Sequence, residues 1–426
     1  MSLLGVRLGH LLTSRRGGTL NSSGKPLTSI EICAGAGGQA LGLHMAGFRH
    51  LALLEIDKFA CRTLRANVSG NPEWAGCEIV EGDVKEVDPF THKQLAEFGL
   101  QPGELDLLAG GVPCPPFSAA GKQLGEDDER DLFPRMLELV GRLRPKAVMI
   151  ENVRGILDTK FDEYRERIVG ELKAYGYEFC GWELIEARRH GVPQLRPRAV
   201  LVMIAKELLA GVKFEWPAGA EEVVTVADAL AETMRERYEP YGARGRAVFD
   251  RWLQAATERG TEAPTLVGGS KKHGGADLGP SRAKAAWAAL GVDAMGVAND
   301  PDACVPERDL FRANGPMLTV EQAAIIQGFP RDWAFEGGKT ARYRQVGNAF
   351  PPPVAEAVGR AIAAVLRPGG QPSSAADGVR MVIPAAGRDT GIAAPAAGQP
   401  PVGPTPAGYG QLPFPEAEPE HAGPSA

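Results

Sequence analysis

The stretch LTSIEICAGAGGQALGLHMAGF, residues 27–48, contains in order an apolar strand pattern, a glycine-rich turn and a helical pattern. The same order follows directly, because LALLEID (51–57) predicts a second strand and KFACRTLRANV (58–68) predicts a second helix. Strands that alternate with helices favour a parallel sheet with helices on both faces. We therefore predict an α/β fold.

The alternation continues as far as residue 205. Further strands are predicted at CEIVEGD (77–83), LDLLAGG (105–111), KAVMIENV (146–153) and RAVLVMIA (198–205), with a helix at LFPRMLELVGRLRP (132–145). In sheets of this kind, ligands bind outside the carboxyl ends of the strands. Polar residues follow most of these apolar runs, so we expect the functional site at that edge of the sheet.

The chain changes character in the middle and at both ends. Residues 207–335 break the alternation, which predicts a second, smaller domain inserted into the first. The first domain would then comprise residues 27–206 and 336–367. Residues 1–26 look like a flexible extension. The Pro-, Gly- and Ala-rich residues 368–426 cannot bury enough surface to offset the entropy of ordering, so we predict a disordered tail.

Composition narrows the class of protein. Of 426 residues, 44% are hydrophobic and 23% are charged, which is ordinary for a globular chain. The six cysteines form no CxxC pair and no zinc-like spacing, which favours a reducing compartment and predicts no bound metal. No apolar run has the length of a membrane span and no signal-peptide pattern is present, so we expect a cytoplasmic protein without a membrane partner.

The net charge of −6 argues mildly against a nucleic-acid partner. However, residues 244–290 hold eight Lys or Arg against four acids. Local patches decide nucleic-acid binding more than the total charge does, so such a partner stays open.

The glycine turn and the next two strand ends form a candidate nucleotide site. AGAGG lets the backbone approach a ligand at a helix start, although it lacks the GxGxxG spacing and such turns also occur without a ligand. Glu55 and Asp83 end the second and third strands, where carboxylates can accept hydrogen bonds from ribose hydroxyls and from an adenine amino group. Each could equally be a strand-end cap. Together the three features favour a cofactor that contains adenosine.

Cys114 stands between prolines in GGVPCPPFSAAGK (110–122), directly after a predicted strand. Proline fixes φ and removes an amide, so the cysteine lies in a stiff, non-helical segment. A lone cysteine is more often an inert small apolar residue. Here Glu151 ends another strand and would place a carboxylate in the same cleft. A thiol beside a proton donor is suited to nucleophilic catalysis.

Two further polar motifs are QLRPR (194–198) and QVGNAFPPP (345–353). Arg196 and Arg198 would project to one face of an extended strand. They could form a fork that binds carbonyl oxygens or phosphates and favours a nearby thiolate, or they could lie on a solvated strand edge. The second motif predicts a Gly-Asn turn and a helix start fixed by proline.

These motifs together resemble those of the DNA (cytosine-5) methyltransferase family, bacterial type. The resemblance extends from about Leu27 to Leu366 and rests on the ordered set EICAGAGG, LLEID, EGD, PCPPFS, IENV, QLRPR, LTVEQAAIIQGFP and QVGNAFPPP. It implies the Rossmann-like sheet of S-adenosylmethionine-dependent methyltransferases, with residues 207–335 as an inserted target-recognition domain. It also implies methyl transfer from S-adenosylmethionine to carbon 5 of a cytosine that is flipped out of a specific double-stranded DNA sequence.

The resemblance implies a role for each matched residue. Cys114 would add to carbon 6 of the base and so make carbon 5 nucleophilic, and it would leave after carbon 5 loses its proton. Glu151 would contact ring nitrogen 3 and the exocyclic amine and supply a proton. Arg196 and Arg198 would hold the ring oxygen and the active-site loop, with Arg198 the more direct contact. The implied cofactor contacts are Cys33, Ala36, Gly37, Gly38, Glu55, Ile56, Asp83, Val84, Gly111, Pro113, Leu132, Asn348 and Ala349.

The sequence departs from the family pattern at three positions. Cys33 stands where many members have phenylalanine, Ile56 where a large aromatic residue can stack on adenine, and Pro115 where glutamine often follows the cysteine. These changes weaken the packing expected around adenine and one expected DNA contact. We expect a monomer, with a separately encoded restriction endonuclease as a candidate partner.

Three alternatives to this interpretation can be compared with the sequence. A tRNA cytosine-5 methyltransferase of the related family would have a shorter variable region and a CFT-like signature, neither of which is present. A DNA-binding homologue without catalysis would be expected to lose Cys114 or the Glu-Asn pair at 151–152, and this chain has both. An unrelated dinucleotide oxidoreductase would explain AGAGG alone.

Overall fold

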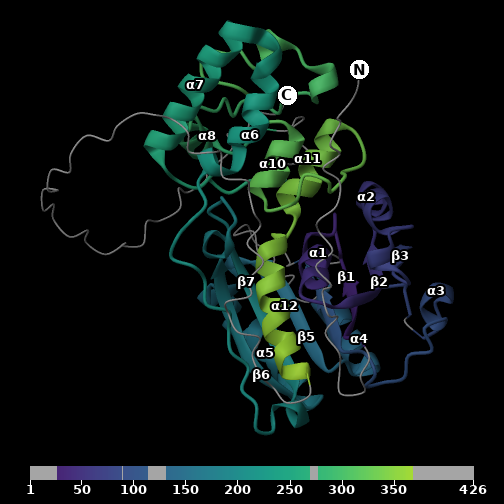
Figure 1. The fold of residues 1–426 in the computed structure, drawn as a ribbon. Helices are drawn as coiled ribbons and strands as arrows, with labels where there is room; N and C mark the ends of the chain where they lie inside the picture. Colours follow the sequence, from purple (N-terminus) through teal and green to yellow (C-terminus); the bar gives the residue numbers. More distant parts are fainter. Residues whose placement is uncertain (1–25, 89, 114–130, 269–276, 368–426) are drawn as a thin grey trace, which may run out of the picture. The chain divides into compact units, whose positions relative to one another are not determined.

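Residues 26–88, 90–113, 131–268 and 277–367 are described by this computed structural model. Residues 1–25 and the predicted disordered tail lie outside the described residues. The central element is one seven-stranded sheet with the order β3-β2-β1-β4-β5-β7-β6 (Figure 1). Its strands are β1 Thr28–Ile32, β2 Arg49–Glu55, β3 Glu78–Glu81, β4 Leu107–Gly110, β5 Ala147–Val153, β6 Tyr177–Glu186 and β7 Pro197–Ala205.

The directions of the strands confirm the predicted α/β sheet and add one reversal. All pairs among β1 to β5 are parallel. Strand β7 runs antiparallel to both of its neighbours, β5 and β6. Only residues 187–196 connect β6 to β7, and a parallel pair needs a longer crossover, usually with a helix. The short connection therefore accounts for the reversal.

Helices cover both faces of the sheet. The helices that alternate with the strands, and the last helix of the chain, are α1 Gly38–Met45, α2 Lys58–Val68, α3 Lys93–Ala96, α4 Phe133–Leu143, α5 Asp162–Ala174 and α12 Pro352–Leu366. Successive residues of β4 point to opposite faces: Leu107 packs in the cluster that holds α1 and α12, and Leu108 packs in the cluster that holds α4 and α5. This alternation buries both faces of the strand, as the apolar sequence predicts.

The described residues between β7 and α12 form helices and loops. These helices are α6 Val226–Tyr238, α7 Gly242–Arg259, α8 Ser281–Ala289, α9 Pro306–Asp309, α10 Val320–Ile326 and α11 Lys339–Asn348. Buried Tyr238, Trp252 and Trp287 belong to one apolar cluster that also holds residues of α2, α10 and α11. The boundaries of the predicted second domain, 207–335, stay a prediction. No described helix has the length and apolar character needed to cross a membrane.

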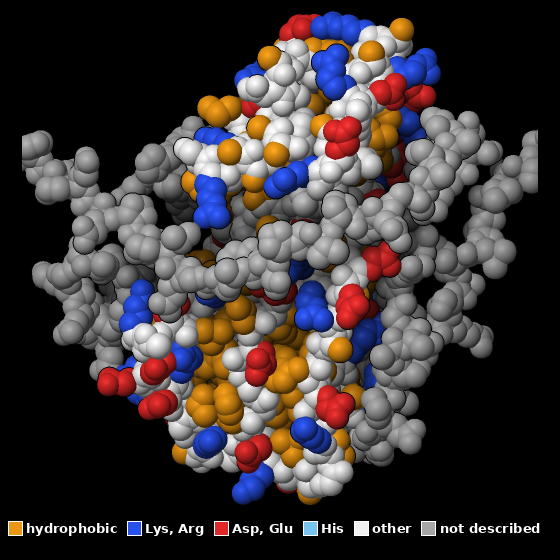
Figure 2. Space-filling view, turned by 90° about the vertical axis from the view of Figure 1, so that its left-hand side faces the viewer, with side chains coloured by type: hydrophobic (Ala, Val, Ile, Leu, Met, Phe, Trp, Pro, Cys, Tyr) orange, Lys and Arg blue, Asp and Glu red, His pale blue; other side chains and the backbone are white. Residues whose placement is uncertain are grey.

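Strand β6 forms one edge of the sheet. Phe179 and Leu184 on this strand are exposed to solvent. Figure 2 shows hydrophobic side chains gathered on the lower part of the face that it presents, with charged side chains of both signs around and among them. The exposed Glu178 and Glu183 stand next to them on the strand, and charges of this kind commonly protect a sheet edge.

Candidate active site

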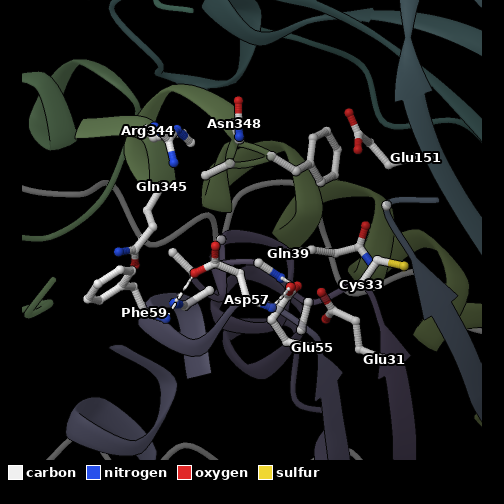
Figure 3. A pocket seen from close by; sticks show the side chains of 18 of the residues that line it. Glu31, Cys33, Gln39, Glu55, Asp57, Phe59, Glu151, Arg344, Gln345 and Asn348 are labelled. Carbon is white, nitrogen blue, oxygen red and sulfur yellow. Dashed lines mark hydrogen bonds between the residues drawn. The ribbon is translucent and has the colours of Figure 1, made fainter. Parts of the chain in front are cut away.

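A cavity of about 270 Å³ lies at the carboxyl ends of β1, β2, β4 and β5 (Figure 3). Its lining residues come from β1 and the glycine turn, from the start of α2, from the ends of β4 and β5, and from α11 and the segment after it. They are Glu31, Cys33, Ala34, Gly35, Ala36, Gly38, Gln39, Glu55, Asp57, Phe59, Ala60, Gly111, Glu151, Ala341, Arg344, Gln345, Asn348, Ala349 and Phe350. The cavity therefore lies at the sheet edge where the sequence predicts a ligand.

A large part of the predicted site lines this cavity. The predicted cofactor contacts that do so are Cys33, Ala36, Gly38, Glu55, Gly111, Asn348 and Ala349. Glu151 lines the same cavity. Cys114 lies outside the described residues, and the chain before it is described up to Pro113. The predicted contacts that do not line the cavity are Gly37, Ile56, Asp83, Val84, Pro113 and Leu132.

The glycines of the first turn have different tasks. A Cβ on Gly38 would lie 2.2 Å from Phe350 O, and one on Gly37 would lie 2.8 Å from the Leu64 side chain. These two glycines are required because α1 packs closely against its neighbours. A Cβ on Gly35 would meet nothing within 4 Å, and Gly35 lines the cavity. Only Gly35 and Gly38 of the three are therefore placed to approach a ligand.

Glu55 fastens the glycine turn to the end of β2. Its Oε2 accepts a hydrogen bond from Gly35 N at 2.7 Å, and its Oε1 accepts from Ile56 N at 2.9 Å and Asp57 N at 2.8 Å. A carboxylate has about four acceptor sites, so Glu55 retains capacity for a ligand hydroxyl. Asp83 instead accepts from Lys85 N at 2.9 Å, which fits the strand-end cap.

Two lining residues, Glu31 and Gln39, are absent from the sequence prediction. They are 1% and 4% exposed, and Glu31 Oε2 and both polar atoms of the Gln39 amide have no hydrogen-bond partner among the described residues. Burial raises the pKa of Glu31 well above its ordinary value, and the carboxylates of Glu55 and Glu151 raise it further. The signal in the sequence is a glutamate between two isoleucines of a predicted strand. Buried polar atoms that face a cavity indicate a polar ligand.

Phe59 is a third unpredicted lining residue. Ile56, where the family often has an aromatic residue, is 66% exposed and does not line the cavity. Phe59 lies in the first turn of α2, which Asp57 caps by accepting from Phe59 N at 2.9 Å. Because Ile56 replaces the usual aromatic residue, the sequence predicts no aromatic ring in the cavity. Phe59 supplies one.

At the other end of the cavity, Glu151 of β5 pairs with Arg198 of β7. Glu151 Oε1 lies 2.9 Å from Arg198 Nε. Burial raises the pKa of Glu151, while the guanidinium groups of Arg198 and, less strongly, Arg196 oppose the rise. A Cβ on Gly111 would lie 3.1 Å from Glu151 Oε2, so the glycine leaves room for the carboxyl.

Asn152 fixes the backbone that leads from β4 toward Cys114. Its Nδ2 donates to Val112 O at 2.9 Å, and its Oδ1 accepts from Val153 N at 2.8 Å. The Glu-Asn pair therefore has two tasks, because Glu151 faces the cavity and Asn152 holds the adjoining loop.

Arg196 has a different environment from Arg198. It is wholly buried, and it donates to Leu266 O at 2.7 Å, Gly347 O at 2.7 Å and Ala349 O at 3.0 Å. The carbonyls that it binds belong to the backbone of this chain. This geometry rules out the solvated strand edge for Arg196, and it differs from the expectation that Arg196 holds the ring oxygen of the base.

Cys33 has a backbone conformation that is rare for a residue with a side chain, with φ 53°. Burial, followed by the carboxylate of Glu55, raises the pKa of its thiol to about 12. The thiol is therefore protonated near neutral pH and is a poor nucleophile. Among the described residues, no group of three or more His, Cys, Asp or Glu could hold a metal ion.

Comparison with known proteins identifies the family of the chain. The family model for C-5 cytosine-specific DNA methylases matches residues 27–364. Type II methyltransferase M.NaeI of Lentzea aerocolonigenes is 48% identical over 346 residues, which are 81% of this chain and 76% of that protein. Type II methyltransferase M.NgoMIV of Neisseria gonorrhoeae is 46% identical over 349 residues, which are 80% of this chain and 98% of that protein.

Solved structures agree on the fold. A DNA modification methyltransferase encoded within an Escherichia coli prophage superposes with a TM-score of 0.53 at 21% identity, over 80% of this chain and 99% of that one. Entamoeba histolytica methyltransferase EhMeth superposes with a TM-score of 0.52 at 14% identity, over 79% and 98%. The match to the family model over most of the chain, with two relatives near half identity, places this chain in the C-5 cytosine-specific DNA methylase family: it is a DNA (cytosine-5) methyltransferase.

Proposed function

We propose that this enzyme methylates carbon 5 of a flipped cytosine within a specific double-stranded DNA sequence, with Cys114 as the nucleophile. The observation that carries the proposal is the Glu151–Arg198 pair, which adjoins Gly111 at the end of the cavity, three residues before Cys114. This arrangement supplies a positioned carboxyl beside Gly111, which precedes the thiol by three residues in the sequence. A thiol and a proton donor are the two groups that addition to the base requires.

The cavity fits S-adenosylmethionine. Figure 3 shows Glu31, Cys33, Gln39 and Glu55 on one side of it and Arg344 and Asn348 on the other. Glu55 has acceptor capacity for the ribose hydroxyls, and the unpartnered polar atoms of Glu31 and Gln39 suit the polar amino-acid end. Phe59 and the small residues of the glycine turn provide apolar walls. When bound, S-adenosylmethionine supplies an electrophilic methyl group on a sulfonium.

The chain's own groups would act on the base in a fixed order. The Cys114 thiolate adds to carbon 6 while Glu151 gives a proton to ring nitrogen 3, which makes carbon 5 nucleophilic. After methylation, a water molecule takes the carbon 5 proton and the thiolate leaves. The Glu151 carboxylate then takes back the proton on ring nitrogen 3, which restores the neutral aromatic base. Burial raises the pKa of Glu151, which favours the protonated carboxyl that the first step needs. Arg198 fixes the orientation of the carboxyl, and Arg196 acts through the backbone that it braces.

We also propose that residues 207–335 read the target sequence and that the enzyme protects DNA in a restriction–modification system. Two relatives near half identity carry the name type II methyltransferase, which supports this assignment. The corresponding partner would be a separately encoded endonuclease that cuts the same DNA sequence.

Labelled S-adenosylmethionine, offered with duplex DNA or with tRNA, tests the substrate. We expect label in duplex DNA only. A duplex that contains 5-fluorocytosine should trap the wild type covalently and leave Cys114→Ser untrapped, although this variant still binds the cofactor. Cys180→Ser is the matched control and should be trapped like the wild type. Transfer to tRNA alone, or trapping of Cys114→Ser, would overturn the proposal.

A further inference from the structure

Asn348, the last residue of α11, lines the cavity and touches a segment that lies 80 residues earlier in the chain. A Cβ on Gly268 would lie 2.1 Å from Asn348 Oδ1 and 2.7 Å from Asn348 Cγ. A Cβ on Gly347 would lie 2.5 Å from Gly268 N. Two facing glycines therefore allow the two backbones to approach until the Asn348 amide lies directly against residue 268.

The segment Ala263–Gly268 is held in place on its other side by the QLRPR motif. Leu195 N donates to Ala263 O at 2.8 Å, and Leu266 N donates to Gln194 Oε1 at 2.8 Å. The Gln194 side chain is fully buried. The path of the segment is thus defined by paired hydrogen bonds up to two residues before Gly268.

Arg196 braces both partners of this contact at once. Its Nη1 donates to Leu266 O, and its Nη2 donates to the carbonyls of Gly347 and Ala349, which flank Asn348. The carbonyls at the C-terminal end of a helix lack helical partners and favour a cation. One buried guanidinium therefore fixes the distance between segment 263–268 and the end of α11.

We propose that Gly268 and Arg196 are positioning residues that set the Asn348 amide for the cofactor, although neither lines the cavity. The inference rests on the proposed function, in which this cavity holds S-adenosylmethionine. Gly268 belongs to the span that we assign to target recognition. Its contact with Asn348 therefore links cofactor affinity to the region that holds DNA, and such a coupling acts equally in both directions.

Gly268→Ala tests the contact with one methyl group. The φ angle of Gly268 lies outside the left-handed region, so alanine can adopt it. The closest atoms that its Cβ meets are Oδ1 and Cγ of the Asn348 side chain, and the next is Arg344 O at 3.0 Å. We expect the displaced amide to weaken binding of S-adenosylhomocysteine, measured by calorimetry without DNA, by roughly tenfold. The KM for S-adenosylmethionine should rise, while kcat at saturating cofactor stays within a few-fold of the wild type.

A double-mutant cycle separates positioning from general damage. Asn348→Ala should weaken binding on its own, and Gly268→Ala should add little in that background, because the amide it displaces is gone and only the 3.0 Å contact with Arg344 O remains. Gly170→Ala, on the exposed side of α5 with nothing within 4 Å of the new Cβ, is the matched control and should bind like the wild type. If Gly268→Ala alone fails to fold, binding is measured for the double variant Gly268→Ala with Asn348→Ala, because that variant lacks the clash with the amide. It should bind S-adenosylhomocysteine about as well as Asn348→Ala does.

The outcomes distinguish the two proposals. If Asn348→Ala weakens binding and Gly268→Ala does not, the positioning role is wrong and the cofactor site stands. If the two effects add in full, or the double variant does not fold, residue 268 acts through its own backbone and the inference fails. If the wild type does not bind S-adenosylhomocysteine, the proposed function of the cavity itself fails.

Discussion

Arg198 Nε lies 2.9 Å from Glu151 Oε1, and the two side chains are only 11% and 14% exposed. Their strands are antiparallel neighbours, and Arg198 pairs across them with Val153, two residues beyond Glu151. Burial raises the pKa of Glu151 and the guanidinium opposes the rise. Two opposing effects thus set the protonation of this carboxyl, and the pH dependence of the reaction should report both.

Arg198→Met should move the pH profile of the single-turnover rate. A step that needs protonated Glu151 slows as pH rises through the pKa of this carboxyl. Removal of the guanidinium raises that pKa further, so the decline should move to higher pH. The maximal rate should also fall, because the carboxyl loses its fixed orientation. The control is Arg142→Met, which breaks the partly exposed pair with Asp88 and should leave the profile unchanged.

Glu151→Gln should lower the turnover rate by about 10²–10⁴, the usual range for a lost acid–base group. Glutamine keeps the size of the side chain and can still donate a hydrogen bond, but it cannot give up a proton. The rate is measured at saturating cofactor and DNA, so that weaker binding does not contribute. A rate within a few-fold of the wild type would show that Glu151 has only a structural role.

The strand-end residues of the site could be predicted because their signal is local. An apolar run followed by a polar residue and a turn marks the end of a strand, and Glu55 and Glu151 were identifiable in this way. Only Glu55 is the last residue of its strand, because β5 continues two residues beyond Glu151 to Val153. Glu31 gives a weaker signal. It lies inside β1, and only the assembled sheet shows that a cavity adjoins it.

The role of Arg196 depends on contacts that no local pattern contains. Leu266 and Gly347, whose carbonyls it binds, are 70 and 151 residues away along the chain. The rule for extended strands treats Arg196 and Arg198 alike. In the structure Arg196 precedes the first residue of β7, and its guanidinium turns toward those carbonyls. Tertiary contacts therefore separated two arginines that the sequence presents as a pair.

The stability of the Glu31→Gln variant relative to the wild type should increase as pH rises. The folded-state pKa of Glu31 lies above its unfolded value, so its contribution to stability is present at low pH and is lost as pH rises toward the folded-state pKa. Glutamine has no such loss. The difference in unfolding free energy should grow by up to about 1.4 kcal/mol per pH unit between the ordinary glutamate pKa and the raised pKa of the folded protein, and then level off.

Melting temperatures of the cofactor-free protein across a pH series measure this difference. Glu73→Gln is the control, because the Glu73 side chain is 78% exposed. The difference in melting temperature between Glu73→Gln and the wild type should not change with pH. A flat difference for Glu31→Gln as well would mean that Glu31 is ionised in the folded protein.

Ending the chain at Gly370 should leave methylation and the melting temperature unchanged. The last helix, α12, ends at Leu366, and the sequence beyond has no core-forming pattern. A chain that ends at Glu356 is the control. It loses Val358 and Ile362, which are fully buried, and should be strongly destabilised. A large fall in melting temperature for the longer chain would contradict the prediction.

Replacing residues 211–315 with the matching span of a relative should transfer the target sequence and leave the chemistry to this chain's Cys114. The exchanged span contains Gly268, whereas its partner Asn348 stays behind. A donor span with glycine at this position should therefore keep the KM for the cofactor. A donor span with a larger residue at position 268 should still transfer the target sequence, but it should raise the KM for the cofactor. Bisulfite sequencing of DNA exposed to the chimera reads the target, and steady-state kinetics reads the cofactor.

Two results distinguish base reading from phosphate binding within this span. Neutralising Lys271 and Lys272 together should weaken DNA binding for every sequence and flatten its salt dependence, as the loss of phosphate contacts does. The methylation pattern should stay the same in that variant, because phosphate contacts carry no sequence information. If the chimera also keeps the original pattern, the residues that read the bases lie outside 211–315. The assignment of target recognition to residues 207–335 would then be wrong.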